Sequence, residues 1–442
     1  MRKGSPHRLE PDSPREARES LPEASRRVDR EIAVALLTGG GDQPYAFGLA
    51  TEFIRRGTRL DLIGSNDLDC TEFHGKPGVR FLNLRGDQRP DVRMTKKVLR
   101  VLLYYARLLR YAVTARPRIF HILWNNKFQF FDRTLLMLFY KLLGKKIALT
   151  VHNVNIGRRD ARDTLLNRLT LGIQYRLTDQ LFVHTEKMKE ELGEEFAVPG
   201  ARVTVIPFGI NNAVPNTSLT VGEAKQRLGI REAEKTILFF GNIAPYKGLE
   251  FLVAAFHRLR GEGDYRLVIA GRPKDCEKYW ATIQRSIGED LQIGKVLLRA
   301  EYIPDEDTEI YFKAADVLVL PYTYIYQSGV LFLGHSFGLP VLAADVGSLK
   351  DEIIEEKTGF MFRPADPVDL ARAIEKYFAS ELFANLSSRR EHIRQYATKQ
   401  HSWEEVGRLT MAAYANLLQL PPAEERSDCE SPKESLGVHT PL

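Results

Sequence analysis

The stretch 236–248 reads TILFFGNIAPYKG, and a helical pattern follows it over 249–260. The stretch joins a short apolar run to a glycine turn and then to a helix, which is the repeating unit of a parallel α/β sheet. Strands covered by helices on both faces are short and apolar throughout. The stretch therefore predicts a parallel α/β domain whose turn lies at the carboxyl end of a strand, where open parallel sheets bind ligands.

The same alternation predicts two such domains. The expected strands cover 32–37, 61–64, 119–123, 146–151, 180–183 and 203–206 in the first half, and 236–240, 266–270, 296–300, 317–320, 341–343 and 359–362 in the second. A capping-box pattern, Ser402 with Glu405, predicts a C-terminal helix. At 442 residues, two hydrophobic cores are the expected number. We expect a disordered tail 1–30, a Rossmann-like domain 31–210, a linker 211–222, a second Rossmann-like domain 223–398, a C-terminal helix 399–420 and a disordered tail 421–442.

Composition excludes several classes of protein. Residues 1–30 are rich in charge and proline and lack the apolar region of a signal peptide, and no apolar run approaches the ~20 residues of a spanning helix. Cys70, Cys276 and Cys429 show neither metal nor redox spacing, which predicts free thiols in a reducing cytoplasm.

A basic segment stands out in a chain whose net charge is +6. Residues 92–131 contain no Asp or Glu. On a helical wheel one face carries Arg93, Lys97, Arg100, Tyr104, Arg107 and Tyr111, and the opposite face carries Val98, Leu99, Leu102, Leu109 and Val113. Two interpretations remain open: a core-packed helix with a solvated outer face, or a basic face that rests on an anionic membrane surface. No recognition motif accompanies the charge, which argues against nucleic acid.

Two loops of the second half suit a phosphorylated ligand. Lys247 precedes one predicted helix, and Gln327, Ser328, Gly329 and Val330 precede another. A diphosphate leaving group needs fixed positive charge and free backbone amides, and these loops offer both. A lysine before a helix is often merely solvated, so the pattern alone does not settle its role.

These residues also carry a family resemblance. The motifs GNIAPYKGL at 241–249, IAG at 269–271, YIPDE at 302–306, AADV at 314–317, PYTYIYQSG at 321–329, FGLPV at 337–341 and TGF at 358–360 resemble the C-terminal domain of family 4 retaining glycosyltransferases. In the first half, GGG at 39–41, TVHN at 150–153 and VIPFGI at 205–210 fit the same pattern more loosely. The resemblance implies the GT-B fold, in which two Rossmann-like domains with parallel sheets face each other and a C-terminal helix crosses back to the first. It also implies a UDP- or GDP-linked sugar donor, retention of anomeric configuration and no bound metal or other cofactor.

The resemblance assigns roles to individual residues. Lys247 would hold the donor diphosphate and His152 would contact the transferred sugar, which makes these two the candidate catalytic residues. The donor would lie against Gly241, Asn242, Gly271, Arg272, Tyr302, Ile303, Gln327, Ser328, Gly329, Val330 and Leu331. The acceptor side would include Gly39, Gly40, Gly41, His152 and Asn153.

The sequence departs from the family pattern at three positions. Asn242 stands where members usually carry Arg, and Ile325 and Leu333 stand where they usually carry Glu. Loss of one charge-assisted hydrogen bond typically costs ~1.5–3 kcal/mol of affinity. Gln327, Tyr324 or Tyr326 are candidates to replace the carboxylates, and Arg272 is a candidate to replace the arginine.

Four histidines and the glycines 39–41 each allow a structural interpretation. His152 ends a predicted strand and precedes Asn153, which favours a cleft residue over a loop cap. His121, His184 and His335 stand in apolar or helical context and are interpreted as structural. The glycines 39–41 lack the spacing of a dinucleotide fingerprint.

The sequence thus predicts a cytoplasmic glycosyltransferase, with a membrane-peripheral location left open. Its expected partners are a nucleotide-sugar donor and a glycan or lipid-linked acceptor, in polysaccharide or glycoconjugate synthesis; the oligomeric state is not predicted. Two alternatives remain: a catalytically degenerate relative that binds a sugar nucleotide or glycan, and a sugar-nucleotide epimerase.

Overall fold

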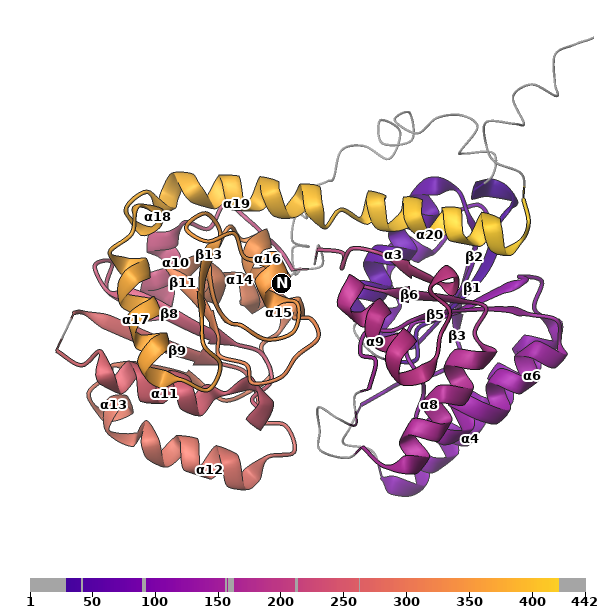
Figure 1. Ribbon diagram of the computed structural model, residues 1–442, viewed down its shortest axis with the longest axis horizontal. Coiled ribbons are helices and arrows are strands. Elements are labelled where there is room, and N and C mark those ends of the chain that lie inside the picture. Colours follow the sequence, from indigo (N-terminus) through magenta and orange to yellow (C-terminus); the bar gives the residue numbers. More distant parts are fainter. Residues whose placement is uncertain are drawn as a thin grey trace, which may run out of the picture.

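The computed structural model describes residues 29–40, 43–89, 93–155, 157, 163–210, 214–261 and 263–420. It contains two parallel sheets in two domains that lie side by side, with the last two helices running across both (Figure 1). The expected fold class, two facing Rossmann-like domains, is confirmed.

The first domain is built on seven parallel strands in the order β3-β2-β1-β4-β5-β6-β7. They are β1 (Ala33–Leu37), β2 (Arg59–Gly64), β3 (Val79–Asn83), β4 (Ile119–Ile122), β5 (Lys146–Thr150), β6 (Gln180–Val183) and β7 (Val203–Val205). One face is covered by α4 (Met94–Thr114), α6 (Met137–Leu142), α8 (Leu165–Leu177) and α9 (Glu186–Phe196). The other face is covered by α3 (Gln43–Arg56) and by α20 (Trp403–Leu417).

The second domain has six parallel strands in the order β10-β9-β8-β11-β12-β13. They are β8 (Lys235–Phe240), β9 (Tyr265–Ala270), β10 (Val296–Arg299), β11 (Val317–Leu320), β12 (Val341–Ala344) and β13 (Gly359–Phe362). One core lies under α11 (Leu249–Arg258), α12 (Glu277–Ser286) and α17 (Pro367–Phe378), and the other under α14 (Asp305–Ala314) and α15 (Gly329–Ser336). Helices on both faces explain why these strands are almost wholly apolar.

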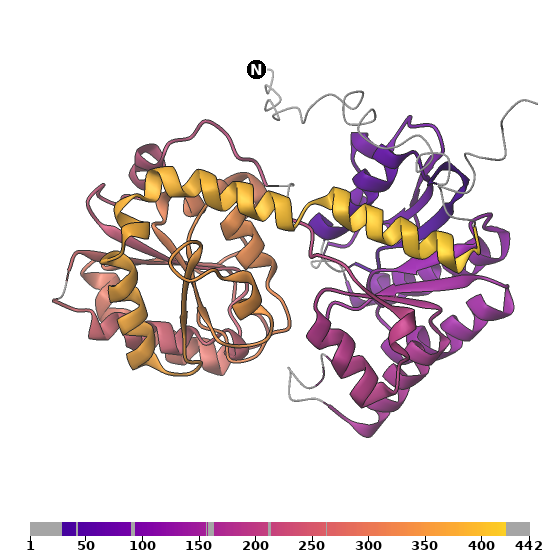
Figure 2. The same ribbon diagram turned by 45° about the horizontal axis from the view of Figure 1, so that its top comes forward.

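The C-terminal segment connects the domains. Helix α19 (Leu386–Gln400) runs along the second domain and α20 along the first, as the two views agree (Figures 1 and 2). Trp403 Nε1 donates to the Ile210 carbonyl at 2.9 Å, and the Ile210 amide donates to the His401 carbonyl at 3.0 Å. Farther along α20, Tyr414 Oη lies 2.5 Å from His121 Nδ1. Helix α20 is therefore part of the first domain's core.

Several elements escaped the sequence analysis. The strand β3 is half-exposed, and its residues are not the continuous apolar run that marked the others. Helices α9, α10 (Val221–Arg227) and α19 were also not predicted. Helix α9 is rich in glutamate, and α10 begins inside the segment interpreted as linker. Gly41, residues 211–213, Cys429, most of the tail 1–30 and the tail 421–442 lie outside the described residues.

Helix α4 corrects the expected orientation of the basic segment. Tyr104 and Tyr111, expected on the outer face, are buried, while Val98, Leu99, Leu102 and Val113, expected to face the core, are exposed. The tyrosines pack inward because their hydroxyls find partners: Tyr104 donates to Asn126 and Tyr111 to Asp61. Of the basic residues, Arg93 and Arg107 are exposed, Lys97 is half-buried and Arg100 donates to the Asp87 carbonyl. The outer surface of α4 is thus largely apolar.

Candidate active site

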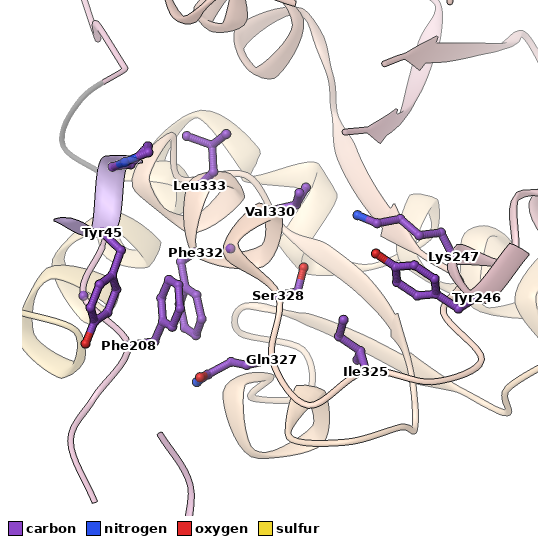
Figure 3. A pocket seen from close by; sticks show the side chains of 13 residues that line it. Tyr45, Phe208, Tyr246, Lys247, Ile325, Gln327, Ser328, Val330, Phe332 and Leu333 are labelled. Carbon is purple, nitrogen blue, oxygen red and sulfur yellow. The ribbon is translucent and has the colours of Figure 1, made fainter. Parts of the chain in front are cut away.

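A cavity of about 350 Å³ lies between the domains at the carboxyl ends of the strands. Figure 3 shows the side chains that line it. Its first-domain wall is Pro44, Tyr45, Phe208 and Gly209. Its second-domain wall comes from two loops, and consists of Tyr246, Lys247, Ile325, Gln327, Ser328, Gly329, Val330, Phe332 and Leu333. The two loops identified from the sequence therefore meet in one cavity.

Lys247 contributes a positively charged side chain to the lining of this cavity. The side chain is only 7% exposed, and Nζ lies 3.0 Å from Tyr322 Oη and 4.7 Å from the centre of that ring. Gly248, which has φ of 63°, lets this loop lie close to the end of β11, the neighbouring strand in the sheet. A Cβ at Gly248 would lie 2.0 Å from the Pro321 carbonyl oxygen, so only glycine allows this approach. The local backbone thus holds Lys247 against the cavity.

The N-terminus of α15 lies in the same wall. Ser328 is the N-cap, and its side chain accepts from the Leu331 amide, which is therefore already occupied. The amides of Gly329 and Val330 belong to the first turn, where backbone donors have no partner within a helix. An anion at this end would also be stabilised by the helix dipole. Of the predicted donor-side amides, Gly329 and Val330 remain best suited to an anion.

Two of the three positions that depart from the family pattern, Ile325 and Leu333, also line this cavity. Ile325 and Leu333 present apolar side chains where carboxylates were expected from the family pattern. Gln327 lies in the same wall, and both its Nε2 and Oε1 are buried without a hydrogen-bond partner among the described residues. Because a buried amide without partners is costly, Gln327 is a side chain prepared for a polar ligand.

The remaining donor-side candidates are arranged around the glycine turns. A Cβ at Gly271 would lie 1.8 Å from the Gly241 carbonyl oxygen, so these two turns touch. Asn242 is exposed, and Arg272 is exposed with its guanidinium 5.7 Å from the Tyr302 ring centre. Tyr302 is exposed and Ile303 is buried in the core. None of Asn242, Tyr302 and Ile303 lines the 350 Å³ cavity.

His152 lies among aromatic side chains of the first domain. It stacks on Trp124 at 4.3 Å with the rings nearly parallel, meets Tyr45 edge-on at 4.8 Å, and its Nδ1 lies 3.0 Å from His184 Nε2. Burial, and secondarily the neighbouring His184, hold the pKa of His152 well below its usual value. Nε2 has no partner among the described residues. His152 lines neither this cavity nor the one described next, and Asn153 also lies outside both. His152 thus contacts Tyr45, which itself lines the 350 Å³ cavity.

A second, more polar cavity of about 520 Å³ adjoins the first domain's strand ends. Gly39 and Gly40 of the predicted acceptor side line it, together with Thr38, Gln43, Ala46, Ser65, Asp67, Leu68, Arg85, Gln88, Asn125, Asn126, Lys127, Arg272 and Lys274. Arg85 was missed by the sequence analysis because it follows β3, which was itself missed. Arg272 and Lys274 come from the loop after β9, so this cavity also spans both domains.

Two features are absent from the residues that the structure describes. Within the described parts of the chain, no group of three or more His, Cys, Asp or Glu side chains is arranged to hold a metal ion. Among those same residues, no helix is both long enough and apolar enough to cross a membrane.

Comparison with known proteins bears on both halves of the chain. A family model described as "Glycosyl transferases group 1" matches residues 221–400, and one described as "Glycosyltransferase Family 4" matches residues 39–214. A D-inositol 3-phosphate glycosyltransferase of Corynebacterium urealyticum is 26% identical over 254 residues, which cover 56% of this chain and 59% of that protein. Curated relatives of this kind are matched over 43% to 69% of their own length.

Solved structures share the fold over most of the chain. Sucrose-phosphate synthase from Thermosynechococcus elongatus superposes with a TM-score of 0.69 at 19% identity, covering 88% of this chain and 100% of that one. Anabaena HepE in complex with UDP and glucose superposes with a TM-score of 0.67 at 13% identity, covering 87% of this chain and 100% of that one. At these identities the likeness establishes the fold alone.

Proposed function

Because the chain belongs to the group 1 glycosyltransferases of family 4, we propose that it transfers a sugar from a UDP- or GDP-linked donor to a glycan or lipid-linked acceptor, with retention. The observation that carries the proposal is the position of Lys247. Its side chain is buried against a cavity between the domains that also holds the N-terminus of α15. HepE, a structural neighbour, has been solved with UDP-glucose, which supports a nucleotide-sugar donor here.

The proposed reaction places charge where the chain can stabilise it. The bond from sugar C1 to the diphosphate oxygen breaks, a bond from C1 to the acceptor oxygen forms, and the acceptor hydroxyl passes its proton to the departing diphosphate oxygen. Negative charge grows on the departing diphosphate, next to the Lys247 ammonium and the amides of Gly329 and Val330. Donors fixed before reaction need no reorganisation, so they favour the transition state over the ground state.

Water must be kept from the sugar during this step. The first-domain wall of the cavity is largely apolar, with Tyr45 and Phe208, and the Phe208 ring stacks on Phe332 of the second domain at 5.2 Å. Contact between the domains at this point closes one side of the cavity. Exclusion of water suppresses hydrolysis and strengthens the charge interactions within the site.

Labelled UDP- and GDP-sugars test the donor role. We expect slow hydrolysis or transfer with one of them, and at least about 100-fold slower turnover in Lys247→Ala. Lys278→Ala, a change at an exposed lysine on α12 of the same domain, is the control and should keep its activity. Full activity in Lys247→Ala would reject the assignment. Isomerisation of the donor without transfer would instead identify an epimerase, and binding without turnover a degenerate relative.

We also propose that the enzyme works at an anionic membrane surface. The helices that cover one face of the first sheet have an apolar outer surface, here termed the outer apolar surface. Its exposed residues are Met94, Val98, Leu99, Leu102, Leu103 and Val113 of α4, Phe128, Phe130, Leu135, Leu138 and Leu142 around α6, and Leu165, Leu166 and Leu169 of α8. The three helices pack on one core, so their outer sides face the same way (Figure 1).

Charge favours a bilayer over a protein partner on this surface. Between Val92 and Arg159 the only acidic residue is Asp132, which is buried and bonded to Tyr105. Arg93, Lys96, Arg107 and Arg110 are exposed on α4 beside the leucines. Apolar side chains that enter the headgroup region, surrounded by cations, match an anionic leaflet, where each cation contributes ~1 kcal/mol.

Vesicle sedimentation tests the membrane proposal. We expect binding to vesicles that contain phosphatidylglycerol, weak binding to pure phosphatidylcholine, and release by salt. Leu102→Glu with Leu138→Glu should abolish binding, and Arg107→Glu with Arg110→Glu should weaken it and remove most of its salt dependence. Leu291→Glu with Ile293→Glu, at exposed apolar sites of the second domain, is the matched control. Equal sedimentation of the Leu102/Leu138 variant and this control would reject the proposal.

A further inference from the structure

The 520 Å³ cavity contains a buried cation that no described residue neutralises. Arg85 is 9% exposed, and its Nη1 is buried without a hydrogen-bond partner among the described residues. No described carboxylate lies within 4.0 Å of its guanidinium, although Asp67 is near enough to favour its charge. An arginine that has lost water without gaining an acceptor is costly, unless a ligand supplies one.

Taking the proposed function as premise, we propose that this cavity is the acceptor subsite and that it binds a phosphate group of the acceptor. The acceptor would thus be a phosphate ester, attached either to a small sugar or polyol or to a lipid. The subsite is distinct from the donor cavity, in which Lys247 and α15 face the leaving diphosphate.

The fold positions Arg85 for this role. Its guanidinium lies over the Tyr104 ring, 5.7 Å from the centre, on the inward face of α4. On another side it lies against the glycine loop after β1, where a Cβ at Gly40 would fall 1.9 Å from Nη1. The φ of 95° at Gly40 also favours glycine. Stacking and loop contact hold the planar group in one orientation, as bidentate recognition of phosphate requires.

The charge of the cavity suits a dianion. Among the residues that the structure describes, its lining contains four cations, Arg85, Lys127, Arg272 and Lys274, and one acid, Asp67. Lys127 comes from the first domain and Lys274 from the second, and both side chains are exposed. Cations that converge from two domains on a polar cavity attract an anion and draw the domains together around it.

The cavity lies next to the donor site. Helix α3 contributes Gln43 and Ala46 to this cavity, and Pro44 and Tyr45 to the donor cavity. A phosphate at Arg85 would therefore leave the rest of the acceptor within reach of the donor sugar. Phe128, an exposed member of the outer apolar surface, directly follows Lys127 in the chain. A lipid-borne phosphate can thus enter from the membrane side, and a small phosphate ester from solvent.

Calorimetry with the full chain, saturated with UDP, tests the subsite. The probes are inorganic phosphate, a hexose 6-phosphate, and a short-chain phosphatidic acid below its critical micelle concentration; the last two separate the small from the lipid source. We expect at least one ester to bind in the presence of UDP. Arg85→Met should weaken that binding about tenfold or more and leave the UDP affinity unchanged, and Arg85→Lys should restore only part of it.

Lys274→Met serves as the second variant, because an exposed side chain is replaced and folding is not at risk. It should weaken phosphate binding several-fold and reduce its salt dependence. Competition between phosphate and UDP would overturn the inference and assign Arg85 to the donor. Equal phosphate affinity in the wild type and both Met variants, or no binding of any probe, would also overturn it. The proposed function fails separately, through loss of UDP binding or of donor turnover in the wild type.

Discussion

At the scale of single residues, the donor cavity is distinguished by an amide rather than a carboxylate. Gln327 keeps two buried polar atoms without partners among the described residues, while Ile325 and Leu333 beside it are apolar. An amide donates as well as accepts, so it can pair with a sugar hydroxyl in either sense. It does so without bringing a negative charge near the leaving diphosphate.

Gln327→Met is therefore expected to separate binding from stability. Loss of a neutral hydrogen bond should lower the donor affinity by about three- to tenfold. The free protein should unfold at the same urea concentration or a higher one, because a buried unpaired amide is removed. Donor titration and urea unfolding measure the two effects. A structural role for Gln327 would give the reverse pattern, with lost stability and unchanged affinity.

The sequence revealed residues that belong to motifs and missed those that depend on packing. Lys247 and Ser328 could be proposed from the sequence because turn and helix-start patterns are local. Arg85 was missed because its importance comes from Tyr104 and Gly40, which are distant in the chain. His152 was proposed by the same local reasoning, but the rings of Trp124 and Tyr45 that contact it could not be foreseen.

At the scale of elements, the loop between β8 and α11 depends on one close approach. Gly248→Ala would place a methyl group 2.0 Å from the Pro321 carbonyl oxygen and displace the adjacent Lys247. We expect turnover to fall at least about 100-fold.

Gly229→Ala is the matched control for that change. Gly229 has a similar φ of 67°, and nothing lies within 4 Å of its added Cβ, so only the backbone strain of ~1 kcal/mol is expected. Activity assays and urea unfolding of both variants separate strain from displacement. Equal activity of the two variants would contradict the proposed importance of the approach.

Strands and helices were predicted well where their hydrophobic pattern reflects which of their faces are buried. The six strands of the second domain are almost wholly apolar, and each was predicted within a few residues of its position in the structure. Strand β3 lies at the edge of its sheet, so half of it is free to be polar. Helix α4 was predicted, but its buried and exposed faces were assigned the wrong way round. Its tyrosines had been counted as surface residues and its leucines as core residues.

At the scale of the whole molecule, buried histidines link stability to pH. Burial lowers the pKa of His121 and His335 to about 3 and that of His184 to about 4. In the unfolded chain these groups bind protons below pH ~6.5. Between about pH 6.5 and pH 4 the unfolded state therefore binds more protons, and stability must fall as the pH falls.

Urea unfolding at pH 7, 6 and 5 should show this loss of stability. Substitution of a single histidine then shows how much that histidine contributes. Both ring nitrogens of His335 are buried without partners among the described residues. His335→Phe should reduce the slope of unfolding free energy against pH by up to about 1.4 kcal/mol per unit. His392→Gln, at an exposed histidine, should leave the slope unchanged. An unchanged slope in His335→Phe would show that this group is not the one titrating.

The bonds that tie Ile210 to His401 and Trp403 have a mechanical consequence. The chain passes between the domains twice, and at the second passage it is fastened to the first by both hydrogen bonds. Two chain segments that are held together at one place can serve as a hinge. We therefore expect the domains to open by rotation about this place and not by sliding past each other. Each opening would therefore return Lys247 and Arg85 to the same mutual alignment when it ends.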